Sequence, residues 1–384
     1  MEKMYNKTSS CLSAFAAIKA QIKFKEKPQR HKDTRMEFLM LWDFNGIAKY
    51  TLSKSYLVFV ILLFTQLTFG QAQTSDIASL PGAFSRMGFG ARGMGMGNSM
   101  SAVKYGNVVS YYNPALSAFQ NKNNFQTSYS FLSLDRSLNF LNYTKTFPFG
   151  TKQNEKGENE PRSIAGFSAG IINAGVSDIP QYDGSGEQTG NLSTSENQFF
   201  FSVSNRFSGK LAIGIAFKFY YYKLYEDVTS TSLGFDIGAL YSLNDNITIS
   251  AVLTDLNTKY KWDTSEIYGT NGKASEDKFP LLKKIGIAYK FDEPNIIAAV
   301  EFESSSAETS YLRFGVEYNI VESLFLRGGL DKWNLQNPDF PVRPSLGFSY
   351  FYKLNNMIIG VDYAFVIEPY SSSDQHIIGV NINF

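Results

Sequence analysis

The sequence predicts an all-β fold, namely a transmembrane antiparallel β-barrel of about 14 strands. Large apolar side chains alternate with small or polar ones along most of the chain, and strand side chains point alternately to opposite faces. Turn residues divide the pattern into segments of about ten residues, which rise roughly 23 Å at a tilt of about 45° and so match a barrel's apolar band. The chain also ends on such a segment, His376 to Phe384, with an aromatic as its last residue. These observations favour an apolar wall facing lipid around a polar lumen.

Composition limits the functions that need to be considered. The 36 basic and 35 acidic residues balance, so nothing indicates a nucleic-acid partner. The only cysteine, Cys11, and one of the two histidines, His31, precede a predicted cleavage site. The mature chain therefore has no thiolate for catalysis or metal binding. Without a histidine pair or a carboxylate cluster at ligand spacing, the sequence predicts no metal site and no cofactor.

The N-terminal part contains a short apolar block, from Tyr56 to Phe69. It is too short for a transmembrane helix and is followed by small residues. We therefore interpret residues 54–72 as a secretory signal peptide cleaved after Ala72, the alternative being a buried helix. Residues 1–53 form an N-terminal extension, and because a signal peptide normally starts the chain, we expect translation to begin within it.

The next segment, 73–122, is rich in glycine and shows little alternation. Its motif glycines are Gly88, Gly90, Gly93, Gly95 and Gly97. The first three fit the G-x-G-x-x-G pattern of dinucleotide-binding loops, but that reading requires a preceding strand, whereas a signal peptide precedes this motif. Tight turns and close backbone approach are the favoured role of these glycines. Further on, Asn113 before Pro114 and Ala115 predicts a short helix, because asparagine caps helices and proline suits the first helical position.

The barrel is predicted to occupy residues 123–384. Its fourteen expected strands are 124–133, 136–147, 163–173, 196–207, 210–225, 230–242, 246–255, 282–291, 294–303, 309–319, 322–332, 343–353, 356–367 and 375–384. Charges at predicted lumen-facing positions are Asp236, Arg313, Glu317, Arg327 and Asp362. Buried charges usually pair, so these residues are expected to hold a filled barrel together, the alternative being that they line a route for a solute.

The connections between these segments alternate between short and long. Outer-membrane barrels have short periplasmic turns and longer outer loops, so both termini are expected in the periplasm. One connection, 148–162, is long where a short turn is expected, which indicates either an inserted periplasmic loop or an error of one hairpin in the count. The predicted outer loops 256–281 and 333–342 carry Trp262 and Trp333, either as anchors for a partner or as packing and lipid-interface residues.

Three stretches carry a family resemblance: GFGARGMGMGNSMSAV from Gly88 to Val103, which includes Ala91 and Arg92, YYNPALSAF from Tyr111 to Phe119, and a late hairpin from Arg343 to Phe365. Over residues 76–384 the chain resembles the PorV/PorQ family of Bacteroidetes outer-membrane proteins, within the FadL-like superfamily. The resemblance implies a fourteen-stranded barrel with the glycine-rich segment as a plug in or against the lumen. It also implies that Phe384 is the terminal aromatic recognised by barrel-assembly machinery. The N-terminal extension and the 148–162 connection depart from the family pattern.

The resemblance implies the leading functional hypothesis. It is an outer-membrane binding and assembly protein, an accessory or cargo shuttle of type IX secretion, with secretion-system proteins and their cargo as partners beside outer-membrane lipid. The alternative is a FadL-like channel for hydrophobic small molecules. An enzyme is not expected, because the one catalytic arrangement available, His376 with Ser371–Ser373 and Asp374, lies among ordinary turn residues and has no oxyanion donors.

Overall fold

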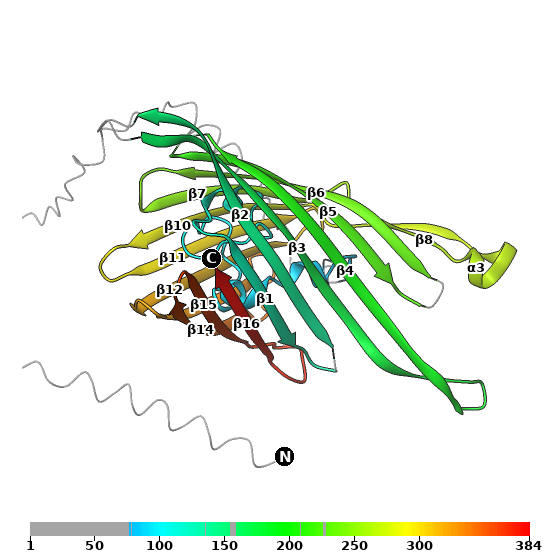
Figure 1. Cartoon of the computed structure of the whole chain (residues 1–384). Helices are drawn as coiled ribbons and strands as arrows, with labels where there is room; N and C mark the ends of the chain where they lie inside the picture. The colour runs from blue at the N-terminus through cyan, green and yellow to red at the C-terminus, as the bar shows by residue number, and fades with distance from the viewer. Residues whose placement is uncertain (1–76, 78, 135, 154–158, 208, 226–227) are drawn as a thin grey trace, which may run out of the picture. The chain divides into compact units, whose positions relative to one another are not determined.

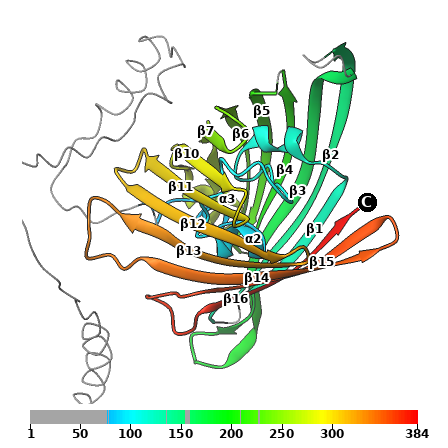
Figure 2. The same ribbon diagram turned by 90° about the vertical axis from the view of Figure 1, so that its left-hand side faces the viewer.

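Fourteen antiparallel strands close into a barrel in the computed structural model (Figures 1 and 2). The structure describes residues 77, 79–134, 136–153, 159–207, 209–225 and 228–384. The barrel closes where the first strand pairs with the last, from Asn124 with Asn383 to Phe131 with His376. The predicted fold class is therefore confirmed. The predicted extension 1–53 and signal peptide 54–72 lie outside the described residues.

The barrel strands follow one another around the wall in chain order, interrupted only where β7 pairs with β10. They are β1 (Asn124–Phe131), β2 (Ser137–Gln153), β3 (Asn159–Tyr182), β4 (Gln188–Arg206), β5 (Leu211–Lys223), β6 (Thr229–Ser242), β7 (Ile247–Leu256), β10 (Leu282–Phe291), β11 (Ile296–Ser305), β12 (Ser310–Val321), β13 (Leu324–Asn334), β14 (Arg343–Leu354), β15 (Met357–Val366) and β16 (Gln375–Asn383). A separate hairpin consists of β8 (Lys259–Asp263) and β9 (Ala274–Lys278). The short helices are η3 (Phe84–Arg86), α2 (Gly90–Gly95), η4 (Pro114–Phe119), α3 (Ser265–Tyr268) and η5 (Gly269–Asn271).

The outer surface of the barrel is apolar in the alternating way that the sequence predicts. On β5, Ile215 and Phe217 are 42% and 48% exposed, whereas the intervening Ala216 is buried inside. Apolar groups in a continuous band this large are unfavourable in water and are typical of a wall that faces lipid. Among the described residues, no helix has the length and apolar character needed to cross a membrane.

The connection predicted at 148–162 is wrong, because strand structure continues through most of it. β2 runs to Gln153 and β3 starts at Asn159. The two strands remain paired through this region, from Pro148 with Ile164 to Gln153 with Asn159. The barrel has fourteen strands, as the sequence predicts, so this connection does not contain an additional hairpin of the barrel wall. The two strands continue as a ribbon past their last pairs with β1 and β4, where consecutive residues of β2 are exposed and the alternating burial is lost.

Two other predicted boundaries differ for the same reason. At the opposite end of the barrel, β3 extends to Tyr182 and β4 begins at Gln188. The two strands form a second polar ribbon there. The predicted outer loop 256–281 folds into the β8–β9 hairpin, and Figure 1 shows α3 at its tip.

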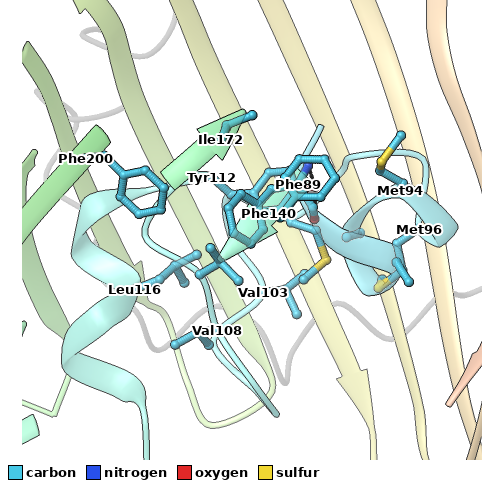
Figure 3. Close-up of a cluster of buried hydrophobic side chains, with 14 of the residues drawn as sticks. Phe89, Met94, Met96, Val103, Val108, Tyr112, Leu116, Phe140, Ile172 and Phe200 are labelled. Carbon is cyan, nitrogen blue, oxygen red and sulfur yellow. Dashed lines mark hydrogen bonds between the residues drawn. The ribbon is translucent and has the colours of Figure 1, made fainter. Parts of the chain in front are cut away.

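The glycine-rich segment fills the lumen, and we call residues 77–122 the plug. Figure 2 shows α2 inside the ring of strands. The buried hydrophobic core lies between the plug and the inner wall (Figure 3), where the Phe89 ring is 4.9 Å from Phe140 and 5.9 Å from Phe200. The predicted short helix is confirmed as η4, a 3₁₀-helix that begins after Asn113, whose side chain accepts a bond from the Ala115 amide at 2.9 Å.

Candidate functional site

The helix η4 is seated against glycines of the barrel wall. An added Cβ at Gly214 of β5 would be 2.5 Å from the Pro114 carbonyl carbon, and one at Gly238 of β6 would be 2.0 Å from Asn113 Oδ1. Asn113 Nδ2 also donates to the Ala239 carbonyl at 3.2 Å. Only glycine lets the two backbones approach this closely, so the Asn-Pro-Ala motif is fixed to the wall.

The glycines of the plug motif serve the same kind of contact. Gly97 has a φ of +58°, and a Cβ on it would be 2.6 Å from the Leu330 amide nitrogen of β13. Gly93 allows the approach of Tyr112, whose hydroxyl accepts from the Phe89 amide at 2.9 Å and donates to Asn98 Oδ1 at 2.8 Å. The remaining motif residues lie on or beside α2: Gly88 (φ +121°), Gly90 (φ +68°), Ala91 and Gly95. Within the described residues no strand precedes this motif, and a dinucleotide loop would require one.

Arg92 of α2 joins the plug to the wall through charge. Its Nε and Nη2 donate to the two carboxylate oxygens of Glu317 on β12, at 2.9 and 2.7 Å. Glu317 also accepts from Arg327 Nε at 2.6 Å. Arg327 donates onward to Ser349, which bonds to Asp362. Three of the predicted lumen charges, Glu317, Arg327 and Asp362, thus form one network with the plug, which we call the Arg92 network.

The other two predicted lumen charges lie in separate networks. Arg313 of β12 contacts Asp331 at 2.7 Å and Glu303 at 3.0 Å, and Asn98 of the plug donates to the same Asp331 at 3.1 Å. Asp236 of β6 pairs with Lys218 at 2.7 Å. All five side chains are buried in the lumen.

Several partners in these networks were not predicted from the sequence. They are Lys218, Asp255, Glu301, Glu303, Asp331 and Arg343. The alternation contains a signal for three of them, because Lys218 occupies an inward position of β5, and Glu301 and Glu303 occupy inward positions of β11.

A cavity opens beside the plug at the end of the barrel away from Asn124 and Phe384, and we call it the distal cavity. It consists of two lobes of about 280 and 380 Å³. Both lobes are lined by Ile77, Met87, Leu132, Arg136, Tyr311 and Lys332. Deeper spaces around the plug measure about 20 Å³ each, room for a single water molecule. These two spaces are far smaller than either lobe of the distal cavity.

The two predicted tryptophan anchors lie in strands. Trp262 on β8 packs 5.2 Å from Tyr222, and its Nε1 donates to Asp277 at 2.8 Å. Trp333 lies in β13 rather than in the predicted loop, because that strand extends to Asn334, and the residue is 44% exposed.

The C-terminal residues also have defined positions. Phe384 is half exposed, and its amide donates to the Asn123 carbonyl at 3.0 Å. His376 Nδ1 bonds to the Tyr363 hydroxyl at 2.7 Å, whereas Ser371 bonds to Ser133. The structure does not bring His376 together with a serine and an aspartate in a catalytic arrangement.

These features define a membrane-spanning antiparallel β-barrel whose lumen is filled by its own N-terminal segment.

No family model matches the sequence, and no curated protein matches it either. Among solved structures, the chain is similar to the Pseudomonas putida toluene transporter TodX, with a TM-score of 0.48 and 15% identity over 77% of this chain and 96% of that one. It is similar to a TodX deltaS2S3 mutant monoaromatic hydrocarbon channel, with a TM-score of 0.49 and 14% identity over 77% and 97% of the two chains. It is also similar to a Pseudomonas aeruginosa FadL homologue, with a TM-score of 0.47 and 11% identity over 77% and 98%. The finer resemblance to the PorV/PorQ family stays a prediction.

Proposed function

We propose that this protein is an outer-membrane channel that takes up small hydrophobic or amphipathic molecules through the distal cavity. The observation that carries the proposal is the cavity itself, with lobes of about 280 and 380 Å³ held inside a lipid-facing barrel. Volumes of this order suit small molecules. The lining of the larger lobe combines apolar side chains with charged ones, among them Arg86 and Glu196, which suits an amphipathic molecule. Phe84, Met87 and Tyr222 supply apolar surface to the larger lobe.

The connections support an orientation for this channel. At the end of the barrel where β16 finishes, β12 meets β13 and β14 meets β15 after only two residues each, 322–323 and 355–356. At the distal end the connection 257–281 is long enough to hold its own hairpin. Outer-membrane barrels keep their short turns in the periplasm. We therefore expect the distal cavity to face outward, and the first and last residues of the barrel segment, Asn124 and Phe384, to lie on the periplasmic side.

Uptake measurements test this function. Cells that carry the protein should accumulate a labelled aromatic hydrocarbon faster than cells that lack it. Ala174→Trp, which places a large ring at the inner wall of the larger lobe, should remove most of the difference. Leu346→Trp, on the outer face of β14, is the matched control and should leave uptake unchanged. Equal uptake with and without the protein would contradict the proposal.

A role in type IX secretion is a second candidate. The observation that favours it is the β8–β9 hairpin, which presents Ile267 and Tyr268 at its tip, with Tyr268 63% exposed. Exposed aromatic groups are common anchors for protein partners. Replacing 257–281 with a short turn should then reduce surface display of secreted cargo, whereas a channel for small molecules predicts no loss of display.

A further inference from the structure

Two charged side chains in the distal cavity have no partner. Glu196 lies on β4 and Lys332 on β13, and both line the larger lobe. Across the described residues, neither side chain makes a hydrogen bond or an ion pair. In the order of strands around the barrel, six strands lie between β4 and β13 in either direction. The two charges therefore stand on opposite walls of the lumen.

The carboxyl group of Glu196 accepts no hydrogen bond from Arg86, the nearby cation of the plug. Arg86 lines the same lobe, but its guanidinium donates to the carbonyls of Ile77, Leu80 and Pro81, at 2.9, 3.0 and 2.5 Å. These bonds turn the donors of Arg86 toward the plug backbone. The carboxyl oxygens of Glu196 thus face the cavity without a bonded donor, although the Arg86 charge remains in the same lobe.

The ammonium group of Lys332 reaches the cavity because of a β-bulge. Leu330 pairs with Phe314 and Trp333 with Leu312, so Asp331 and Lys332 together oppose one residue of β12. Lys332 has a φ of +56°, and a bulge of this kind re-aims a side chain that strict alternation would place on the other face. Lys332 consequently lines both lobes of the cavity.

The carboxylates close to Lys332 already form ion pairs with other side chains. Asp331 pairs with Arg313 at 2.7 Å and with Arg343 at 3.2 Å. Glu303 pairs with Arg313 at 3.0 Å and with Lys284 at 3.3 Å. Lys332 therefore presents an ammonium group without a bonded acceptor, opposite the Glu196 carboxyl group, which has no bonded donor.

We propose that the distal cavity binds a zwitterion whose ammonium and carboxylate groups are separated by an apolar body. The ammonium group meets Glu196, the carboxylate group meets Lys332, and the body lies on Phe84 and Met87 between them. Partly buried charges gain when a ligand supplies the missing partner, and charge-assisted hydrogen bonds are the stronger kind. A short apolar peptide with free ends has this charge pattern. The inference rests on the proposed uptake function and specifies its substrate class.

A matched set of probes tests the inference on the purified full chain in a non-ionic detergent at pH 7. The probes are 8-aminooctanoic acid, octanoic acid and octylamine, with the corresponding twelve-carbon set as a second length. Calorimetry should show that the zwitterion binds at least about tenfold more tightly than either singly charged probe of the same length.

Two isosteric substitutions assign the charges. Glu196→Gln should reduce zwitterion binding to the level of octanoic acid, and Lys332→Met should reduce it to the level of octylamine. The matched controls, Glu187→Gln on the exposed β3–β4 connection and Lys353→Met on β14, should leave the preference unchanged.

The outcomes separate this inference from the proposed function. If octanoic acid or octylamine binds as tightly as the zwitterion, or if no probe binds, the zwitterion inference is overturned. Uptake of the labelled hydrocarbon tests the channel independently. Normal hydrocarbon uptake with no zwitterion preference would overturn only the substrate class, whereas loss of both would overturn the channel as well.

Discussion

Arg92 of the plug and Glu317 of the barrel wall form a two-point ion pair inside the lumen, with N–O distances of 2.9 and 2.7 Å. The two residues are 225 positions apart in the chain. Both side chains are largely buried, at 11% and 4% exposure. The pair therefore joins the plug to the wall where water screens the charges little.

Removing one partner of this pair should destabilise the protein. Arg92→Met leaves Glu317 with Arg327 alone, and breaking a buried pair costs about 3–5 kcal/mol. We expect a lower free energy of unfolding in urea and more frequent single-channel openings in planar bilayers, because the plug is held less firmly. Arg92→Lys should recover only part of the effect, since lysine cannot form the two-point contact.

A double substitution controls this prediction. Arg92→Met combined with Glu317→Gln should be destabilised by less than the sum of the single substitutions, because the residues contact each other. Additive effects and unchanged conductance would mean that the pair does not hold the plug.

The seat of η4 gives a second prediction. Gly214→Ala would place a Cβ 2.5 Å from the Pro114 carbonyl carbon, so the plug helix must shift. Overpacking of this kind costs about 1–3 kcal/mol. Urea unfolding should show the loss, and Gly184→Ala, where an added Cβ meets nothing within 4 Å, is the matched control. Equal stabilities of the two variants would contradict the close seat.

The sequence predicts the barrel well where lipid demands alternation, and poorly beyond it. Ile215 and Phe217 reveal the faces of β5 because lipid requires apolar groups on every second position. Pro148 and Gln153 lie on a ribbon in which consecutive residues are exposed, so the alternation that defines strands elsewhere is absent. The strand count could be predicted for this reason, whereas the lengths of β2 and β3 could not.

The candidate site could be predicted only in part. The inward positions of Arg313 and Glu317 follow from the alternation of β12. The partner of Glu317 comes from the plug, and nothing in local sequence relates it to Arg92. Lys332 escapes any alternation argument, because the bulge in β13 turns it toward the cavity.

The lipid-facing wall itself can be tested with a charge. Phe217→Arg replaces an exposed ring in the middle of the apolar band of β5. An arginine at the membrane midplane costs a barrel about 2–4 kcal/mol, so folding into lipid vesicles should be weakened by this amount. Tyr182→Arg, at the end of the β3 ribbon, should have little effect. Equal folding of both variants would mean that this face does not meet lipid.

Acid should loosen the β8–β9 hairpin. A hydrogen bond from Lys259, at 2.7 Å, lowers the pKa of the exposed Glu276 carboxyl. A lowered folded-state pKa adds stability that is present above the unfolded-state value of about 4.3 and is lost as the pH falls through the folded-state value. Amide exchange in 259–278 should therefore speed up relative to the barrel strands below about pH 4. The Glu276→Gln variant should lack this pH-dependent component, and an identical pH response in both proteins would contradict the assignment.

The terminal aromatic should matter more for assembly than for stability. Phe384 is 49% exposed, and its ring centroid lies 6.5 Å from that of Tyr143, so Phe384→Ala removes little buried surface from the folded barrel. We expect a change of about 1 kcal/mol or less in the unfolding of purified protein. If Phe384 is the residue that assembly machinery recognises, its loss should nevertheless reduce the amount of barrel in the membrane severalfold, as measured by immunoblots of membrane fractions. Tyr143→Ala, which removes the other ring of this pair, is the control and should leave the membrane level close to normal. A fall in membrane level that only matches a fall in stability would assign Phe384 a packing role instead.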